Sequence, residues 1–279
     1  MVYETIPVTI RGEETNARLY TYFWSNSKEL YDGRRRPCVL ICPGGAYAMT
    51  SDREAEGLAV RFLEMGYHAA VLRYSTAPDA VFPDAFLQAA ECMKLLKEHA
   101  DEWFIDPDRI LIQGSSAGGH LAAMVSTYWH VPELARILDT TPEMIRPAGQ
   151  ILSYPVITAG TFRNEGSFKN LLGDQADESL EEACSLELNV SEYTPKTFIW
   201  HTYEDQSVPV QNSLLYVNAL VKAGVPMEFH LFPKGPHGLG TATDLSLSSD
   251  GRGVEAQCGQ WMDLAKAWID HNILEDSGK

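Results

Sequence analysis

The chain has 279 residues, enough for one large α/β domain or two small ones. Its composition, with 45% hydrophobic and 22% charged residues, is that of an ordinary globular protein. Acidic residues outnumber basic ones by 38 to 22, which gives a formal net charge of −16. This balance disfavours nucleic acid and anionic membrane surfaces as partners.

The cysteines are scattered, odd in number and form no Cys-x-x-Cys pair, so we interpret them as free thiols in a reducing compartment. The first residues show no secretory signal. No stretch of the sequence comes close to the run of about 18 apolar residues that a membrane-spanning helix needs. We therefore expect a cytoplasmic protein that does not contact a membrane. The sequence gives no oligomeric state, and a homodimer is a possible assembly.

Strand and helix patterns alternate along the chain. Stretches at 8–10 and 17–22 predict an edge hairpin, and a helix is expected between the candidate caps Ser51 and Asp52 and a stop at Gly66. Further strands are expected at 38–42, 69–72, 110–113, 149–153, 197–200 and 228–232. Further helices are expected at 84–99, 117–128, 210–223 and 254–272. This order predicts a single α/β domain over 1–279, with a mainly parallel sheet and helices on both faces.

Residues 154–193 depart from this rhythm. The segment is acidic and reads as short helices over one end of the sheet. We interpret it as a small cap-like insertion.

A Gly-x-Ser-x-Gly pentapeptide, Gly114 to Gly118, lies between a predicted strand and a predicted helix. In that setting the pattern is typical of a nucleophile elbow, in which a tight turn lifts a serine hydroxyl clear of the sheet. Ser116 is the central residue and the candidate nucleophile, whereas the side chain of Ser115 is expected to point elsewhere. The backbone N–H of Ala117 is one candidate donor to an oxyanion.

Two later loops carry a candidate base and acid. His237 follows the last strand in a glycine-flanked loop, where an imidazole can accept the serine proton. Of the other seven histidines, His130, His201 and His230 are the least easily dismissed. Asp205 follows the strand at 197–200 and can orient the imidazole, with Glu204 as its rival. The chain order of serine, aspartate and histidine is that expected of this arrangement.

The loop Pro43-Gly44-Gly45-Ala46-Tyr47 follows the strand at 38–42. Its glycines let the backbone approach a substrate closely, so this loop is the expected source of the second oxyanion donor. Gly44 and Tyr47 are candidate substrate contacts. Two interpretations are open for Tyr47 and Tyr74. Their rings stack on a sugar ring, or they pack in the core or on the surface.

These motifs resemble those of α/β-hydrolase carboxylesterases, a group that includes hormone-sensitive-lipase-like enzymes and bacterial acetyl-xylan and feruloyl esterase-like proteins. The resemblance extends from about residue 17 to 272. It implies ester hydrolysis through a triad of Ser116, Asp205 and His237. It also implies oxyanion donors at Gly45, Ala46 and Ala117.

The chain departs from the lipase-like branch in two ways. Pro43 replaces a histidine, which resembles the sugar-ester esterases more closely. Ala46 stands where a third glycine is common, and it keeps its N–H. The long N-terminal cap of the lipase-like branch is also missing. The resemblance therefore implies short-chain esters as substrates, with acetylated sugars or xylo-oligosaccharides as candidates.

Two other functions remain as alternatives. A prolyl-oligopeptidase-like serine peptidase shares the triad order, but this chain has no room for a propeller domain. A non-catalytic ligand-binding protein on the same fold would need none of the three triad residues. No metal or organic cofactor is expected, because no cluster of histidine, cysteine and aspartate has ligand spacing.

Overall fold

The computed structural model describes residues 1–275, which form one eight-stranded sheet in the order β1-β2-β4-β3-β5-β6-β7-β8. β1 and β2 run antiparallel as an edge hairpin, and all pairs from β4 to β8 are parallel. The strands are β1 (Thr5–Ile10), β2 (Glu13–Tyr22), β3 (Arg36–Cys42), β4 (His68–Arg73), β5 (Ile105–Ser115), β6 (Gln150–Ser153), β7 (Thr197–Thr202) and β8 (Met227–Phe232). The predicted α/β-hydrolase fold class is confirmed.

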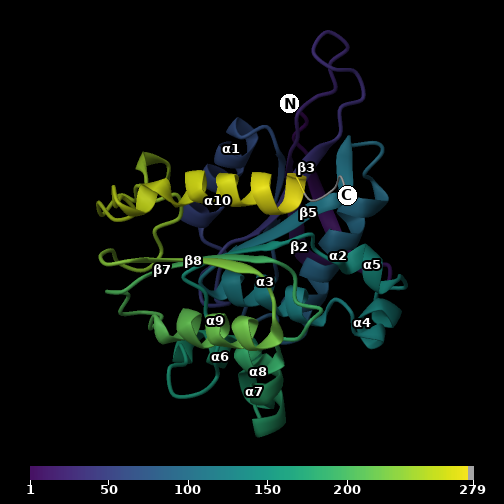
Figure 1. Ribbon diagram of the computed structural model, residues 1–279. Helices are drawn as coiled ribbons and strands as arrows, with labels where there is room; N and C mark the ends of the chain where they lie inside the picture. Colours follow the sequence, from purple (N-terminus) through teal and green to yellow (C-terminus); the bar gives the residue numbers. More distant parts are fainter. Residues whose placement is uncertain (276–279) are drawn as a thin grey trace.

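Helices cover both faces of the sheet (Figure 1). The larger helices are α1 (Glu56–Glu64), α2 (Asp84–Glu98), α3 (Ala117–Tyr128), α9 (Gln211–Ala223) and α10 (Trp261–Ile269). Strand side chains alternate between two apolar clusters, because successive residues of a strand point to opposite faces. One cluster packs under α2, α3 and α9, and the other packs under α1 and α10.

The insertion consists of short helices, as its sequence predicts. They are α6 (Glu165–Leu172), the 3₁₀ turn η2 (Gly173–Gln175), α7 (Glu178–Cys184) and α8 (Leu186–Asn189). Two further short helices, α4 (Pro132–Ile137) and α5 (Pro142–Ile145), precede β6. Within residues 1–275, no helix is long and apolar enough to cross a bilayer.

Two predicted helix boundaries are wrong. The closing helix begins at Trp261 rather than 254, because Gly253 takes a φ of 103° and Glu255 donates its N–H to Ala242, which ties this segment to the preceding loop. At the other end of the chain, Ser51 makes no side-chain capping bond. A 3₁₀ turn, η1 (Asp52–Glu54), separates Ser51 from α1.

Candidate active site

The pentapeptide forms a strained turn between β5 and α3. Ser116 has φ 55° and ψ −122°, a backbone conformation that L residues rarely adopt. Both glycines are needed, since a Cβ on Gly114 would strike the carbonyl of Gly118, and a Cβ on Gly118 would strike that of Cys42. The turn therefore holds the serine hydroxyl at the carboxyl end of the central strand.

The three predicted side chains meet in one hydrogen-bonded chain. Ser116 Oγ lies 2.7 Å from His237 Nε2, and His237 Nδ1 lies 2.6 Å from Asp205 Oδ2. Ser115 is instead fully buried, and its Oγ accepts a hydrogen bond from Gln113. Glu204, the rival of Asp205, is exposed to solvent. The structure thus brings together the favoured residue of each alternative.

The surroundings of the Asp205 carboxylate favour its ionised form. Its Oδ1 accepts hydrogen bonds of 2.9 Å from the backbone N–H groups of Ser207 and Val208. Burial by itself raises the pKa of Asp205, but hydrogen bonds from His201 and His237 and from Val208 outweigh it and hold that pKa well below the usual range. A buried anion of this kind fixes the orientation of the imidazole beside it.

The loop after β3 presents free backbone donors beside Ser116. Gly45 and Ala46 have φ values of 130° and 54°, and within residues 1–275 neither uses its N–H in a hydrogen bond. Ala117 begins α3, where the first N–H groups of a helix lack intrahelical partners. The helix dipole also favours negative charge at this end. These donors are the ones that the sequence analysis expects at an oxyanion hole.

The two predicted substrate contacts from this loop need correction. The Gly44 N–H is 2.8 Å from Glu54 Oε2, so it is already occupied, and a Cβ there would lie 2.8 Å from the Cβ of Ser116. The Tyr47 ring is 3% exposed, and its hydroxyl lies 2.8 Å from His120 Nδ1. The side chain of Tyr47 therefore packs into the apolar core. Because the core covers its ring, Tyr47 cannot stack on a sugar.

Two buried residues that the sequence analysis did not single out as site residues, Glu54 and Tyr154, contact the loops of the site. Glu54 is 2% exposed; its carboxylate accepts hydrogen bonds from the Gly44 N–H and, at 2.8 Å, from the Tyr154 hydroxyl. The same Tyr154 oxygen accepts the Gly240 N–H at 2.7 Å, and its ring meets His237 edge to face at 5.0 Å between centroids. Burial, reinforced by Glu54, raises the pKa of Tyr154 well above its usual value. In the sequence, nothing near Glu54 distinguishes it from an exposed acidic residue in the first turn of a helix.

Helix α6 of the insertion contacts two loops of the site. Asn170 donates a hydrogen bond of 2.8 Å to the carbonyl of Ala46 in the loop after β3, residues 43–47, which is called the oxyanion loop below after its proposed role. Asn164, the N-cap of α6, donates one of 2.8 Å to the carbonyl of Ser207 in the Asp205 loop. The insertion is therefore attached both to the loop with the free donors and to the loop with the carboxylate.

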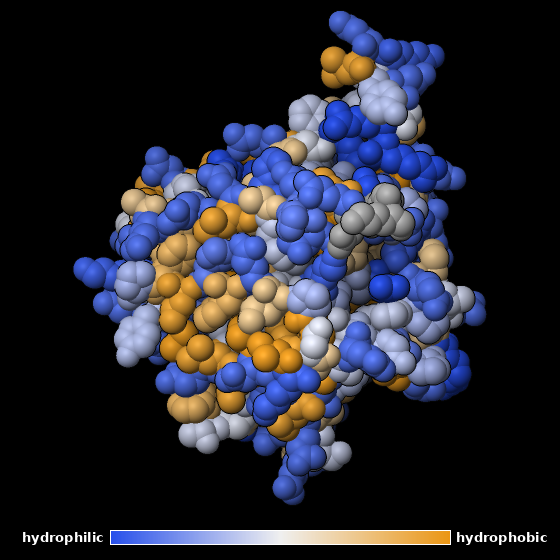
Figure 2. Space-filling model, in the orientation of Figure 1, coloured by the Kyte–Doolittle hydropathy of each residue, from blue (hydrophilic) through white to orange (hydrophobic). Residues whose placement is uncertain are grey.

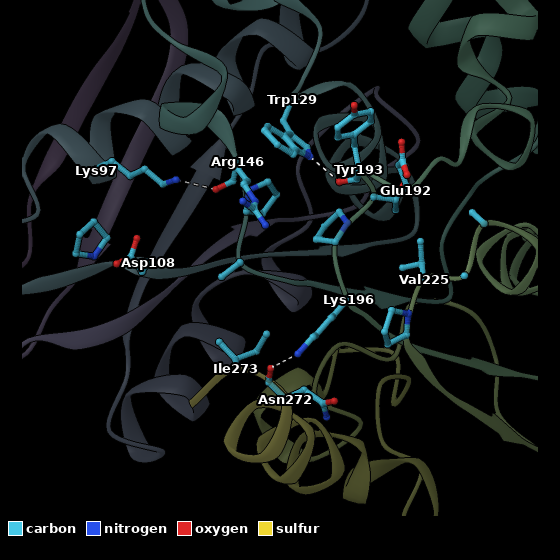
Figure 3. Close-up of a pocket in the computed structure, with 18 residues that line it drawn as sticks. Lys97, Asp108, Trp129, Arg146, Glu192, Tyr193, Lys196, Val225, Asn272 and Ile273 are labelled. Atoms are coloured by element: carbon cyan, nitrogen blue, oxygen red, sulfur yellow. Dashed lines mark hydrogen bonds between the residues drawn. The ribbon is translucent and has the colours of Figure 1, made fainter. Parts of the chain in front are cut away.

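A large cavity lies elsewhere, at the amino-terminal ends of the strands (Figure 3). It has a volume of about 680 Å³ and contains Lys97, Arg146 and Lys196. Lys97 Nζ donates to the carbonyl of Arg146 at 2.8 Å, and Lys196 Nζ donates to that of Asn272 at 2.8 Å. The Arg146 guanidinium lies over the Trp129 ring. These positively charged side chains therefore connect segments that are distant in sequence. The cavity lies at the end of the sheet opposite Ser116.

The strand order, the elbow and the hydrogen-bonded serine, histidine and aspartate are those of an α/β-hydrolase. The chain belongs to the BD-FAE family, which matches residues 29–220. This confirms the resemblance to carboxylesterases that the motifs indicate.

Two named relatives are similar to this chain over about three quarters of its length. The chain is 36% identical over 220 residues to endo-1,4-beta-xylanase B of Butyrivibrio fibrisolvens, and 30% identical over 212 residues to acetylxylan esterase of Xylanibacter ruminicola. These matches cover 76% and 74% of this chain but only 34% and 41% of the relatives. The chain thus spans less than half the length of these relatives.

Solved structures match over nearly their full length. The acetyl ester-xyloside bifunctional hydrolase of Caldicellulosiruptor lactoaceticus has a TM-score of 0.82 at 35% identity, covering 96% of this chain and 95% of that one. The carboxylesterase Cest-2923 of Lactobacillus plantarum has a TM-score of 0.84 at 27% identity, with 97% of each chain covered.

Proposed function

We propose that this protein is a serine esterase that hydrolyses short-chain carboxylic esters through an acyl-enzyme. The observation that carries this proposal is the hydrogen-bonded chain from Asp205 through His237 to Ser116, next to the free donors of the elbow and oxyanion loop. Such a chain supplies a nucleophile, a base and an orienting anion together.

In the first step Ser116 Oγ attacks the ester carbonyl while His237 Nε2 accepts the hydroxyl proton. The N–H groups of Gly45, Ala46 and Ala117 stabilise the resulting oxyanion. His237 then gives the proton to the departing alcohol, which leaves the acyl group on Ser116. A water molecule, deprotonated by His237, attacks this acyl-enzyme and releases the acid and the free serine.

We further propose acetylated sugars or xylo-oligosaccharides as substrates. The support is the printed names of the relatives, which include an acetylxylan esterase and an acetyl ester-xyloside hydrolase. The insertion is short and is attached through α6 to both loops, which favours a small acyl group. The five cysteines are buried and unpaired, which supports a reducing, cytoplasmic location.

The test is turnover of p-nitrophenyl esters with acyl chains from acetyl to dodecanoyl, and acetate release from acetylated xylo-oligosaccharides. We expect the wild type to prefer acetyl esters and Ser116→Ala to lose turnover, with Ser115→Ala retaining it. Equal rates in the wild type and Ser116→Ala would refute the esterase mechanism. Comparable cleavage of an aminoacyl-anilide would instead indicate a peptidase.

A further inference from the structure

Arg53, in the 3₁₀ turn η1, packs along the loop that carries His237. The carbonyl of Arg53 accepts a hydrogen bond of 3.0 Å from Ser246 Oγ, and a Cβ on Gly240 would strike the same carbonyl. The guanidinium lies further along this loop, because its Nη2 would be 3.2 Å from a Cβ on Gly238, the residue after His237. The side chain of Arg53 therefore runs along the loop from Gly240 toward the proposed base.

The charge of Arg53 has no partner in the part of the chain that the structure describes. Within residues 1–275 its guanidinium makes no hydrogen bond and no ion pair, although the side chain is partly buried. Both sequence neighbours are acidic, but each is engaged elsewhere. Asp52 pairs with Arg73 at 2.7 Å, and the Glu54 carboxylate accepts the two hydrogen bonds described above. The guanidinium is therefore available to an anion from outside the chain.

Arg53 adjoins the part of the site from which the alcohol leaves. In the proposed mechanism His237 Nε2 gives its proton to the alcohol oxygen, so the alcohol part of the ester lies next to His237. Gly238 follows directly with a φ of 76°, and its lack of a side chain leaves space beside the guanidinium. The His237 side chain is 19% exposed, so solvent reaches this loop. A group carried by the alcohol can approach Arg53 there.

We infer that Arg53 binds a carboxylate carried by the alcohol part of the ester. This inference rests on the proposed esterase function and narrows its substrates. A guanidinium presents its N–H donors in a planar fork that fits the two oxygens of a carboxylate. Among sugar esters, the matching substrate is an acetylated uronic acid or an oligosaccharide that carries one.

The charge of the whole chain makes such a contact detectable. Figure 2 shows hydrophilic side chains over much of the face drawn there, with apolar ones gathered between α9 and α10. Acidic residues outnumber basic ones by 38 to 22, so the protein as a whole repels an anionic ester. Without a local cation, an ester that carries a carboxylate would react more slowly than its neutral counterpart. Faster reaction of the anionic ester would therefore indicate a local contact.

The test compares acetoxybenzoate with acetoxybenzamide, each with the second group at the meta or para position. Both are acetyl esters of a phenol, and they differ in the charge on that phenol. We expect wild-type kcat/KM to be roughly tenfold higher for the acetoxybenzoate at the better-fitting position. Arg53→Gln should bring this ratio to one or below. Arg53→Lys should keep part of it, because an ammonium retains the charge but not the fork.

The matched control is Arg34→Gln, which removes an exposed arginine that precedes β3 and changes the net charge by the same amount. It should keep the wild-type ratio. A second readout is inhibition by the alcohol product. The inhibition constant of meta-hydroxybenzoate should rise roughly tenfold in Arg53→Gln, and more than that of meta-hydroxybenzamide.

The outcomes separate this inference from the proposed function. Each ratio is taken within one variant, so a general loss of folded protein lowers both rates and does not change the ratio. Equal kcat/KM for the two esters in the wild type, or an unchanged ratio in Arg53→Gln, overturns the inference and leaves the esterase function intact. No turnover of either ester by the wild type would refute the esterase function, and this inference with it.

Discussion

Glu54 Oε2 lies 2.8 Å from the backbone nitrogen of Gly44, and this contact joins a buried carboxylate to the loop that carries the proposed oxyanion donors. The N–H groups of Gly45 and Ala46, which follow Gly44, form no hydrogen bond within residues 1–275. The other Glu54 oxygen accepts the Tyr154 hydroxyl, whose ring contacts His237. Glu54 therefore connects the oxyanion loop with the surroundings of the proposed base.

We expect Glu54→Gln to lower kcat by roughly one to two orders of magnitude with little change in KM, since a misplaced oxyanion donor acts mainly in the transition state. The amide keeps the shape of the side chain but cannot accept both hydrogen bonds. Steady-state kinetics with p-nitrophenyl acetate measure the split. Glu56→Gln, an exposed neighbour on α1, is the matched control and should behave as wild type. An unchanged kcat in Glu54→Gln would contradict the positioning role.

Tyr154→Phe removes the hydroxyl that Glu54 and the Gly240 N–H share. Buried polar groups left without partners destabilise a fold, so we expect the free energy of unfolding to fall by about 1–3 kcal/mol. Urea denaturation measures this loss. Tyr203→Phe, at a tyrosine 68% exposed, should change stability little. Equal stability of both variants would mean that the Tyr154 hydroxyl is dispensable.

Asp205→Asn should lower kcat by roughly 10³- to 10⁴-fold while the protein stays folded, because the amide no longer stabilises the imidazolium or its tautomer. The readout is the kinetics of acetyl ester hydrolysis, together with circular dichroism. Glu204→Gln tests the rejected alternative at the next position and should retain activity. A larger loss in Glu204→Gln than in Asp205→Asn would reverse the assignment.

Gly118→Ala should abolish the folded elbow, since its Cβ would enter the carbonyl of Cys42 and there is no flexible side chain to move aside. Gly166→Ala in α6 is the matched substitution, because its Cβ would meet nothing closer than the side-chain oxygen of Asn164 at 3.7 Å. A helical glycine replaced by alanine at an open site stabilises by up to about 1 kcal/mol. Thermal unfolding of both variants gives the comparison, and a soluble, wild-type-like Gly118→Ala would contradict the packing argument.

Acid should destabilise the protein partly through His120. Burial lowers the pKa of His120 from 6.5 to about 4, so the unfolded chain binds its proton at a higher pH than the folded one. This contribution is present above pH 6.5 and is lost as the pH falls to 4, by roughly 3 kcal/mol. The free energy of unfolding, measured by urea denaturation at several pH values in this range, should fall less steeply with decreasing pH for His120→Asn than for wild type. An identical slope would mean that His120 does not titrate on unfolding.

The sequence by itself determined the fold class and most of the elements. Apolar runs such as Cys38–Cys42 identify buried strands, because a parallel sheet covered on both faces needs apolar residues throughout. α3 begins and ends where its pattern predicts, and Gly224 ends α9 in the left-handed conformation. The Gly-x-Ser-x-Gly pattern between a strand and a helix also predicted the turn.

Only the tertiary structure decided which further residues support the predicted serine, histidine and aspartate. Glu54 and Tyr154 are 100 positions apart and meet through contacts between loops, which no local periodicity records. The same holds for Tyr47, an aromatic on a candidate binding loop that proves to be buried against His120. Local patterns specify strands, helices and turns because these depend on near neighbours. Burial and hydrogen-bond partners depend on the packing of the whole chain, so the support of the site emerges only from the fold.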